Sequence, residues 1–128
     1  MENHTLIDWE QLDAIADGWD PDFVEIYREF EQELPADLLS LRDALASGDA
    51  EAVARAAHRA KGCAANFGFE RVREKMLAIE TQARAGDISQ AAALLDEAFQ
   101  ACGASCDLVR RERLSEQAVG LIKVSRNF

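Results

Sequence analysis

The fold is decided by residues 20–49, which read DPDFVEIYREFEQELPADLLSLRDALASGD. This stretch opens with an Asp that suits a helix N-cap and a Pro that suits the first helical position. Its large apolar residues recur at helical spacing along one stripe, and it ends at a Ser-Gly pair that favours helix termination. The residues of the stripe are Phe23, Ile26, Tyr27, Phe30, Leu34, Leu38, Leu41 and Leu45. The pattern therefore predicts one long amphipathic helix. Pro35 lies inside the pattern and lacks an amide donor, so we expect a kink there.

Three further amphipathic segments follow, separated by short turns that contain Gly. The first starts after Asp49, which suits an N-cap, and ends near Gly68. The second covers about residues 69–85, with Val72, Met76, Leu77 and Ile79 as its apolar positions. The third starts near Ile88, with Gly103 either breaking it or tolerated within it. Four such helices joined by short turns predict an all-α fold, an antiparallel four-helix bundle.

A shorter helical pattern precedes the long helix, over residues 7–16, with Asp8 placed to cap its start. We therefore divide the chain into an N-terminal packing helix (1–19), the bundle (20–107) and a C-terminal helical extension (108–128) whose structure the pattern leaves open. The apolar positions of the first helix are Ile7, Trp9, Leu12 and Ile15.

The charge is unevenly distributed along the chain. Its 14 basic and 24 acidic residues give a net charge of −10, which disfavours general electrostatic binding to nucleic acid or to an anionic membrane surface. Residues 1–51 hold 15 acidic and 2 basic side chains, whereas residues 52–75 hold 2 acidic and 6 basic ones. One short basic segment therefore lies in an otherwise acidic protein.

Three cysteines cannot all pair within the chain, and no stretch resembles a secretory signal or a membrane span. We therefore expect a cytoplasmic protein with reduced thiols. Cys102 and Cys106 are four positions apart, but no further ligand lies near them in the sequence, so we interpret them as partly buried thiols rather than a zinc site.

Most motifs of catalytic sites are missing from the sequence. It has no Gly-rich phosphate loop, no metal-binding His-Glu-x-x-His or Glu-x-x-His pair, and no Gly-x-Ser-x-Gly elbow. We therefore expect neither ATP nor a metal nor another cofactor to be bound by this chain.

His58 is the one residue in a setting that suggests chemistry. At about 100° per residue, it points roughly 140° away from the apolar face of its predicted helix, so it should be exposed. This geometry weakens its interpretation as a core histidine and leaves two others, a reactive residue or an ordinary surface residue. A neutral imidazole nitrogen is a competent nucleophile near neutral pH.

The neighbours of His58 favour the reactive interpretation. Gly62 lies one turn later, where Gly costs about 1 kcal/mol relative to Ala, so close approach of a partner would explain it. Ala65, on the next turn, has a small side chain and would also allow close approach. Lys61 and Arg55 lie three positions to either side of the histidine, where they would supply positive charge to a phosphoryl group. The alternative is a solvated basic face.

The motif His58-x-x-Lys61-Gly62, with small residues after it and Gly68 ten positions after the histidine, resembles the signature of histidine-containing phosphotransfer (HPt) domains of two-component phosphorelays. The resemblance spans about residues 20–102, since the order of helices and Gly-Asp turns also matches.

Two residues depart from the family pattern. Ala60 stands where Leu is frequent, and Cys63 stands where Ser is usual. Neither change removes the proposed chemistry.

The resemblance implies a role for each matching residue. His58 would be the phospho-acceptor, Lys61 would balance phosphoryl charge, and Gly62 would leave clearance for a receiver domain. Family members often carry a polar residue near the imidazole on the next helix, and Glu80 is the best match. It would orient the ring by accepting its other N–H, or it is simply an exposed helix acid. We further expect Arg55, Arg59 and Ala65 to contact the partner.

The resemblance also implies a stand-alone, monomeric phosphorelay shuttle that works between a hybrid sensor kinase and a response regulator. Its partners would be receiver domains, and Mg²⁺ would be held by the receiver. The alternative is a non-catalytic helical adaptor that binds a receiver or kinase without phosphotransfer. A kinase-type bundle with a degenerate ATP domain is disfavoured, because fewer than 30 residues follow Phe99.

Overall fold

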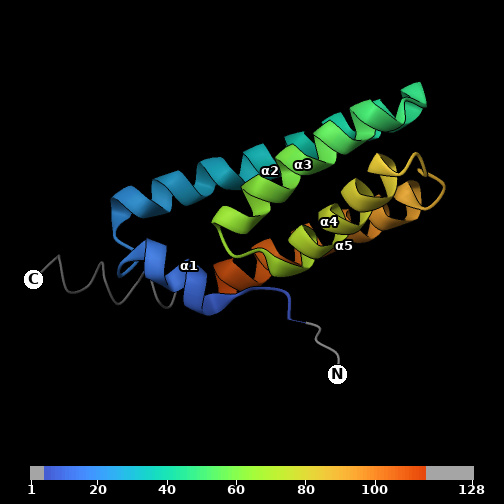
Figure 1. The fold of residues 1–128 in the computed structure, drawn as a ribbon. Coiled ribbons are helices and arrows are strands. Elements are labelled where there is room, and N and C mark those ends of the chain that lie inside the picture. The colour runs from blue at the N-terminus through green and yellow to red at the C-terminus, as the bar shows by residue number, and fades with distance from the viewer. Residues whose placement is uncertain (1–4, 115–128) are drawn as a thin grey trace, which may run out of the picture.

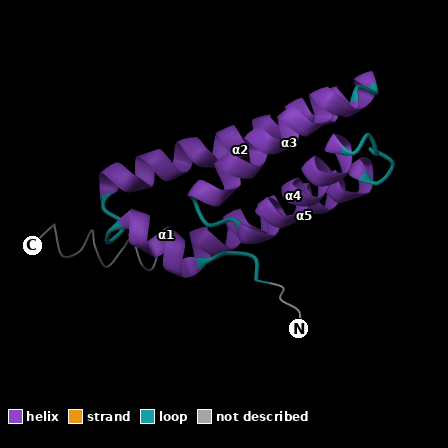
Figure 2. Ribbon diagram, viewed as in Figure 1, coloured by secondary structure: helices purple, strands orange, loops and turns teal. Residues whose placement is uncertain are grey.

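The computed structural model describes residues 5–114 of the 128-residue chain. Within that range the structure consists of five α-helices joined by short turns, with no β-strand (Figure 2). The predicted all-α class is therefore confirmed. The helices are α1 (Trp9–Ala16), α2 (Pro21–Ser47), α3 (Ala50–Asn66), α4 (Glu70–Arg84) and α5 (Ala91–Glu112).

The four long helices form the predicted antiparallel bundle (Figure 1). α3 packs against α2 and α4, and α5 also packs against α2 and α4, so the four helices enclose one core. The short helix α1 lies at the end of the bundle where α2 begins (Figure 1). None of the helices in the described part of the chain is long and apolar enough to cross a membrane.

The helix starts follow the capping residues of the sequence. The Asp20 carboxylate accepts a hydrogen bond from the Phe23 amide at 2.9 Å, and Pro21 occupies the first position of α2. Asp49 caps α3 through the amides of Glu51 and Ala52. Pro35 lies inside α2, which runs unbroken from Pro21 to Ser47 because its buried side chains hold both halves in the core.

The start of α5 differs from the sequence expectation, and its passage through Gly103 decides between the two alternatives that the sequence left open. The helix begins at Ala91 rather than near Ile88, and it passes through Gly103 to Glu112. Gly103 is exposed, and the buried residues on either side of it keep the helix packed against the core. α5 therefore runs across position 107/108 without a break, while the rest of the 108–128 extension, from residue 115 on, lies outside the described residues.

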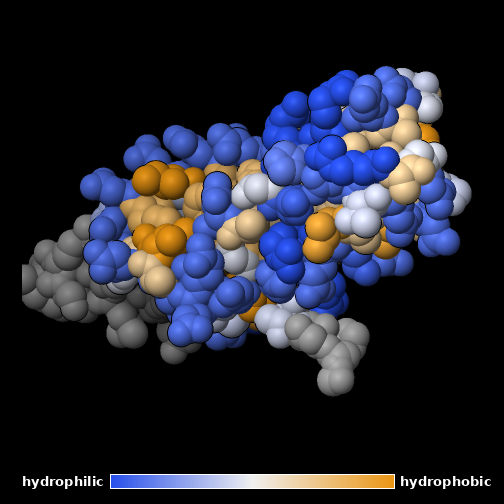
Figure 3. All heavy atoms as spheres, viewed as in Figure 1, coloured by the Kyte–Doolittle hydropathy of each residue, from blue (hydrophilic) through white to orange (hydrophobic). Residues whose placement is uncertain are grey.

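Three apolar residues that the helical pattern assigned to packing faces are exposed instead. They are Ile15, Ile26 and Leu77. In α2 the core position is taken by Tyr27, which places Ile26 about 100° away from it, on the surface. Hydrophobic side chains gather over α1 and the first part of α2, the elements that carry Ile15 and Ile26 (Figure 3).

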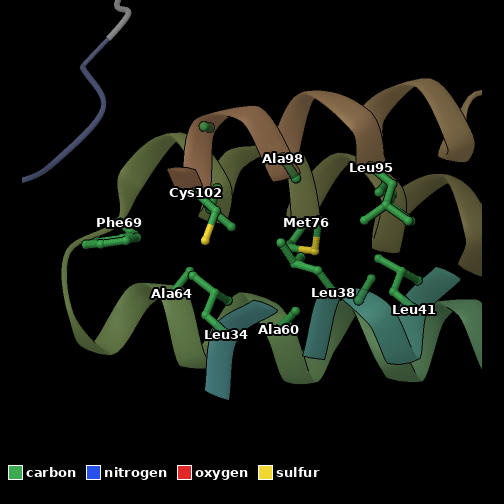
Figure 4. Close-up of a cluster of buried hydrophobic side chains, with 14 of the residues drawn as sticks. Leu34, Leu38, Leu41, Ala60, Ala64, Phe69, Met76, Leu95, Ala98 and Cys102 are labelled. Atoms are coloured by element: carbon green, nitrogen blue, oxygen red, sulfur yellow. The ribbon is translucent and has the colours of Figure 1, made fainter. Parts of the chain in front are cut away.

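The core is built from large side chains on α2 opposite small ones on α3. Figure 4 shows leucines of α2 together with Ala60 and Ala64 of α3, all directed toward Met76 of α4 and toward α5. Alanines on the inner face let the backbone of α3 approach its neighbours closely. The labelled core residues are Leu34, Leu38, Leu41, Ala60, Ala64, Phe69, Met76, Leu95, Ala98 and Cys102.

Helix α1 is fastened to the end of α5 by one carboxylate. Asp13 accepts two hydrogen bonds from Arg113, Nε to Oδ1 at 2.9 Å and Nη2 to Oδ2 at 2.7 Å, and a third from Trp19 Nε1 at 2.9 Å. The Arg113 guanidinium also lies 4.2 Å from the centre of the Trp9 ring. We call these four residues the α1 clamp.

The segment before α1 is fastened to the turn between α3 and α4. The Asp8 amide donates to the Gly68 carbonyl at 2.7 Å, and the Arg71 amide donates to the Leu6 carbonyl at 3.1 Å. Gly68 has φ +70°, and a Cβ there would lie 2.7 Å from the Asp8 carbonyl oxygen. Only glycine meets both demands, so the N-terminal segment fixes the turn that joins the two helices of the site.

Candidate functional site

His58 lies near the middle of α3, with its ring on the outside of the bundle. Its side chain is 62% exposed, whereas Ala57 and Ala60 on either side of it are fully buried. The exposure expected from the helical angle is therefore present. The histidine stands on a rigid element, because the opposite face of the same helix forms part of the core.

Glu80 lies beside the imidazole on α4. Its Oε2 is 2.8 Å from His58 Nδ1, and the residue is only 6% exposed. α4 presents it there because Met76, Ile79 and Ala83 face the core and place the intervening turn against α3. Glu80 is therefore a buried carboxylate in contact with the ring and not an exposed helix acid.

Two cations share this carboxylate with the imidazole. Lys61 Nζ lies 2.7 Å from Glu80 Oε1, and Arg84 Nη2 and Nε lie 2.8 and 3.2 Å from Oε2. Lys61 is 26% exposed and Arg84 is 58% exposed. The site is thus a buried anion surrounded by three nitrogen groups that reach it from the surface.

The carboxylate remains ionised in this setting. Burial by itself raises the pKa of Glu80, but the hydrogen bonds from Lys61, Arg84 and His58 together lower the pKa to about 2. Glu80 is therefore negatively charged throughout the physiological pH range.

This geometry decides which ring nitrogen is available for chemistry. A carboxylate accepts and cannot donate, so Nδ1 of His58 carries the proton that points to Glu80. In the neutral ring Nε2 then has a free lone pair, on a side chain that is mostly open to solvent. The arrangement produces a nucleophilic nitrogen at a fixed place on the surface.

The outer face of α3 around His58 combines open space with exposed side chains. Beside Gly62 there is open space, with no atom within 4 Å of the position of an added Cβ. Arg59 is exposed and Ala65 is half-buried on the same outer side of α3. Arg55, expected to flank the ring, is exposed and pairs with Glu51 at 3.8 Å. Lys61 is therefore the cation of α3 that reaches the site.

Arg84 is a site residue that sequence analysis missed. It lies one turn after Glu80, where an acid and a base four positions apart face each other on a helix, and this spacing was the signal available. Arg84 also lines a hollow of about 350 Å³ between α3 and α4, whose other lining residues are Glu51, Ala54, Ala83 and Gly86.

The cysteines contribute nothing to this site. Cys63 is half-buried, and burial, with Asp37 and Glu33 nearby, raises the pKa of its thiol to about 12. Cys102 and Cys106 are buried in α5. Among residues 5–114, no group of three or more His, Cys, Asp or Glu side chains is placed to hold a metal ion.

Comparison with known proteins gives a family match. The model of the Hpt domain family matches residues 25–118. The crystal structure of histidine-containing phosphotransfer protein B (HptB) from Pseudomonas aeruginosa PAO1 is similar to this chain, with a TM-score of 0.79 and 25% sequence identity, over 88% of this chain and 97% of that one. No curated protein matches. Because the family model covers well over half of its length, this chain belongs to the Hpt family, the histidine-containing phosphotransfer domains of two-component phosphorelays.

Proposed function

We propose that this protein is a phosphorelay intermediate that accepts a phosphoryl group on Nε2 of His58 from the aspartate of one receiver domain and passes it to another. The observation that carries the proposal is the exposed imidazole whose Nδ1 is fixed by Glu80 at 2.8 Å. That contact leaves Nε2 as the nitrogen that faces an incoming partner.

In the transfer, the Nε2 lone pair attacks phosphorus in line with the bond to the aspartate oxygen. The Nε2–P bond forms, the P–O bond breaks, and the aspartate leaves as a carboxylate. The receiver holds the Mg²⁺ that balances charge on its side. On this side Lys61 supplies the charge, because its Nζ is anchored to Glu80 at 2.7 Å and still partly exposed.

The receiver would dock on the outer face of α3. Gly62 leaves room for its backbone to approach, and Arg59 and Ala65 lie on the same face. Arg55 would join this contact surface one turn before His58. The partners we propose are the receiver domain of a hybrid sensor kinase and a response regulator, each bound transiently by a monomer in the cytoplasm.

Phosphotransfer profiling tests this proposal. The full-length protein is incubated with a panel of phosphorylated receivers, and acid-labile phosphate on the protein is measured. We expect transfer to the wild-type protein and none to His58→Gln. The chain has one other histidine, so His4→Gln is the matched control and should accept phosphate normally.

Equal labelling of His58→Gln would overturn the assignment. Tight association of a receiver with the protein, with no label transferred and no effect of His58→Ala on binding, would instead indicate a non-catalytic adaptor.

A further inference from the structure

The group that touches Nδ1 of His58 carries a full negative charge. A neutral amide would orient the ring equally well, because it too accepts one hydrogen bond. The carboxylate of Glu80 does more than a neutral acceptor, since it lies 2.8 Å from Nδ1 and is shielded from water at 6% exposure. Charge at that distance in a water-poor site favours a proton on the nitrogen.

The proton on Nδ1 matters for the strength of the phosphoryl bond. When the neutral ring attacks through Nε2, the product is a phosphorylated imidazolium that retains its Nδ1 proton. When the Nε2–P bond later breaks, its electron pair returns to Nε2 and the ring leaves as a neutral imidazole. If Nδ1 has lost its proton, the ring must leave as an imidazolate, which is a far poorer leaving group.

We propose that Glu80 holds the proton on Nδ1 of phosphorylated His58 and thereby keeps the phosphoryl group ready to leave. This role rests on the proposed function and adds to it a residue that sets how readily the phosphoryl group departs. The acceptor of the phosphoryl group is a receiver aspartate in the relay or water in hydrolysis.

The charged groups that face the ring determine how strong this effect is. Lys61 from α3 and Arg84 from α4 both pair with Glu80, and Arg84 shares Oε2 with the ring. A phosphoryl group on Nε2 offers both cations a second anion. When Lys61 and Arg84 turn toward the phosphoryl group, the imidazolium remains as the partner of the Glu80 carboxylate. Phosphorylation itself therefore strengthens the Glu80–His58 pair.

The contributions of charge and geometry separate in two substitutions with opposite effects. Glu80→Gln keeps the shape and one acceptor but removes the negative charge, so Nδ1 should lose its proton at lower pH. Arg84→Gln removes a positive charge and frees Oε2 for the ring, so Nδ1 should keep its proton to higher pH. A role limited to holding the ring in place does not predict this opposition of signs.

The full-length wild type and both variants are phosphorylated with phosphoramidate, which needs no receiver, and followed by ³¹P NMR from about pH 5 to about pH 9. We expect the titration midpoint of the phosphorylated ring to fall by about one pH unit or more in Glu80→Gln. Loss of phosphate at a pH above both midpoints should then be about tenfold slower. Glu97→Gln is the matched control, because it breaks the ion pair with Lys75 on another face of α4, and it should leave the midpoint unchanged.

Unchanged midpoints in both variants, or shifts of the same sign, would overturn the role of Glu80 while leaving His58 as the phosphorylated residue. Failure of phosphoramidate to label His58 would overturn both that role and the proposed function. A third outcome is that phosphoramidate labels the protein with the expected shifts but no receiver transfers phosphate to it. This outcome would support the role of Glu80 and contradict the proposed function in a phosphorelay.

Discussion

Gly62 and Gly68 lie six positions apart, one inside α3 and the other just past its end, and their surroundings are opposite. A Cβ at Gly68 would lie 2.7 Å from the Asp8 carbonyl oxygen, and the residue has φ +70°. A Cβ at Gly62 would meet nothing within 4 Å, inside an ordinary helical turn. Gly68 is therefore required by the fold. No contact in the described part of the isolated protein requires Gly62, and under the proposed function it leaves room for the receiver domain.

The largest effect is expected from Gly68→Ala. An alanine here would have to adopt a left-handed backbone conformation, and its methyl group would push away the Asp8 segment. We therefore expect a loss of about 3 kcal/mol in the free energy of unfolding. Urea denaturation measures it. Gly48→Ala is the control, since Gly48 has φ +76° and open space around it and should lose only about 1 kcal/mol. Equal losses at the two positions would show that the contact with Asp8 does not matter.

The α1 clamp holds down the segment that occupies the space at Gly68, and breaking it should have a smaller effect. Asp13 and Arg113 are partly exposed, so we expect a coupling energy of about 1 kcal/mol in a double-mutant cycle of Asp13→Asn and Arg113→Gln. A coupling near zero would mean that the Asp13–Arg113 ion pair does not help to hold α1 in place.

The clamp should also depend on pH. Hydrogen bonds from Arg113 lower the pKa of Asp13 below its usual 3.8, against a rise from partial burial. A carboxylate with a lowered pKa stabilises the fold above its unfolded pKa, and that stabilisation is lost as the pH falls through its folded pKa. The difference in stability between wild type and Asp13→Asn should therefore be present at neutral pH and shrink below about pH 4. A difference that persists at the lowest pH would contradict the ionic origin.

The smallest effect on stability is expected at Gly62, and its sign is opposite. Gly62→Ala should stabilise the protein by up to about 1 kcal/mol, because Ala is the better helix former and nothing obstructs its methyl group. Gly103→Ala, in α5, is the matched control and should stabilise to a similar degree.

The two sites should differ in activity. A larger residue, Gly62→Gln, should slow phosphotransfer from a receiver about tenfold or more, by a clash worth over about 1.4 kcal/mol, while Gly103→Gln should not. Equal transfer rates in these two stable variants would show that Gly62 does not face the receiver.

The fold was largely predictable because its signals are local. Asp20 and Asp49 mark helix starts through hydrogen bonds within their own turns, and Pro21 marks one through its fixed backbone angle, so a single sequence suffices to place them. The exposure of His58 followed from its angle on α3 in the same way. The prediction that Ile26 packs in the core was wrong. Helical spacing alone does not distinguish an apolar residue that faces the core, such as Tyr27, from an apolar neighbour on the surface.

The partners of the site were harder to predict because they come from different helices. The contact of Glu80 with His58 joins positions 22 apart, and it depends on the relative rotation and register of α3 and α4. The α1 clamp joins positions 100 apart, which no local pattern specifies. Arg84 carries a local signal, its spacing from Glu80, but that spacing acquires meaning only once Glu80 is known to touch the ring.

Both tryptophans of the chain belong to the α1 clamp, one stacked under the Arg113 guanidinium and the other bonded to Asp13. The intrinsic fluorescence of this protein therefore reports on the docking of its first helix and not on the bundle as a whole. Circular dichroism, by contrast, is dominated by the four long helices. Comparing the two signals during unfolding would show, without any label, whether α1 detaches before the bundle melts.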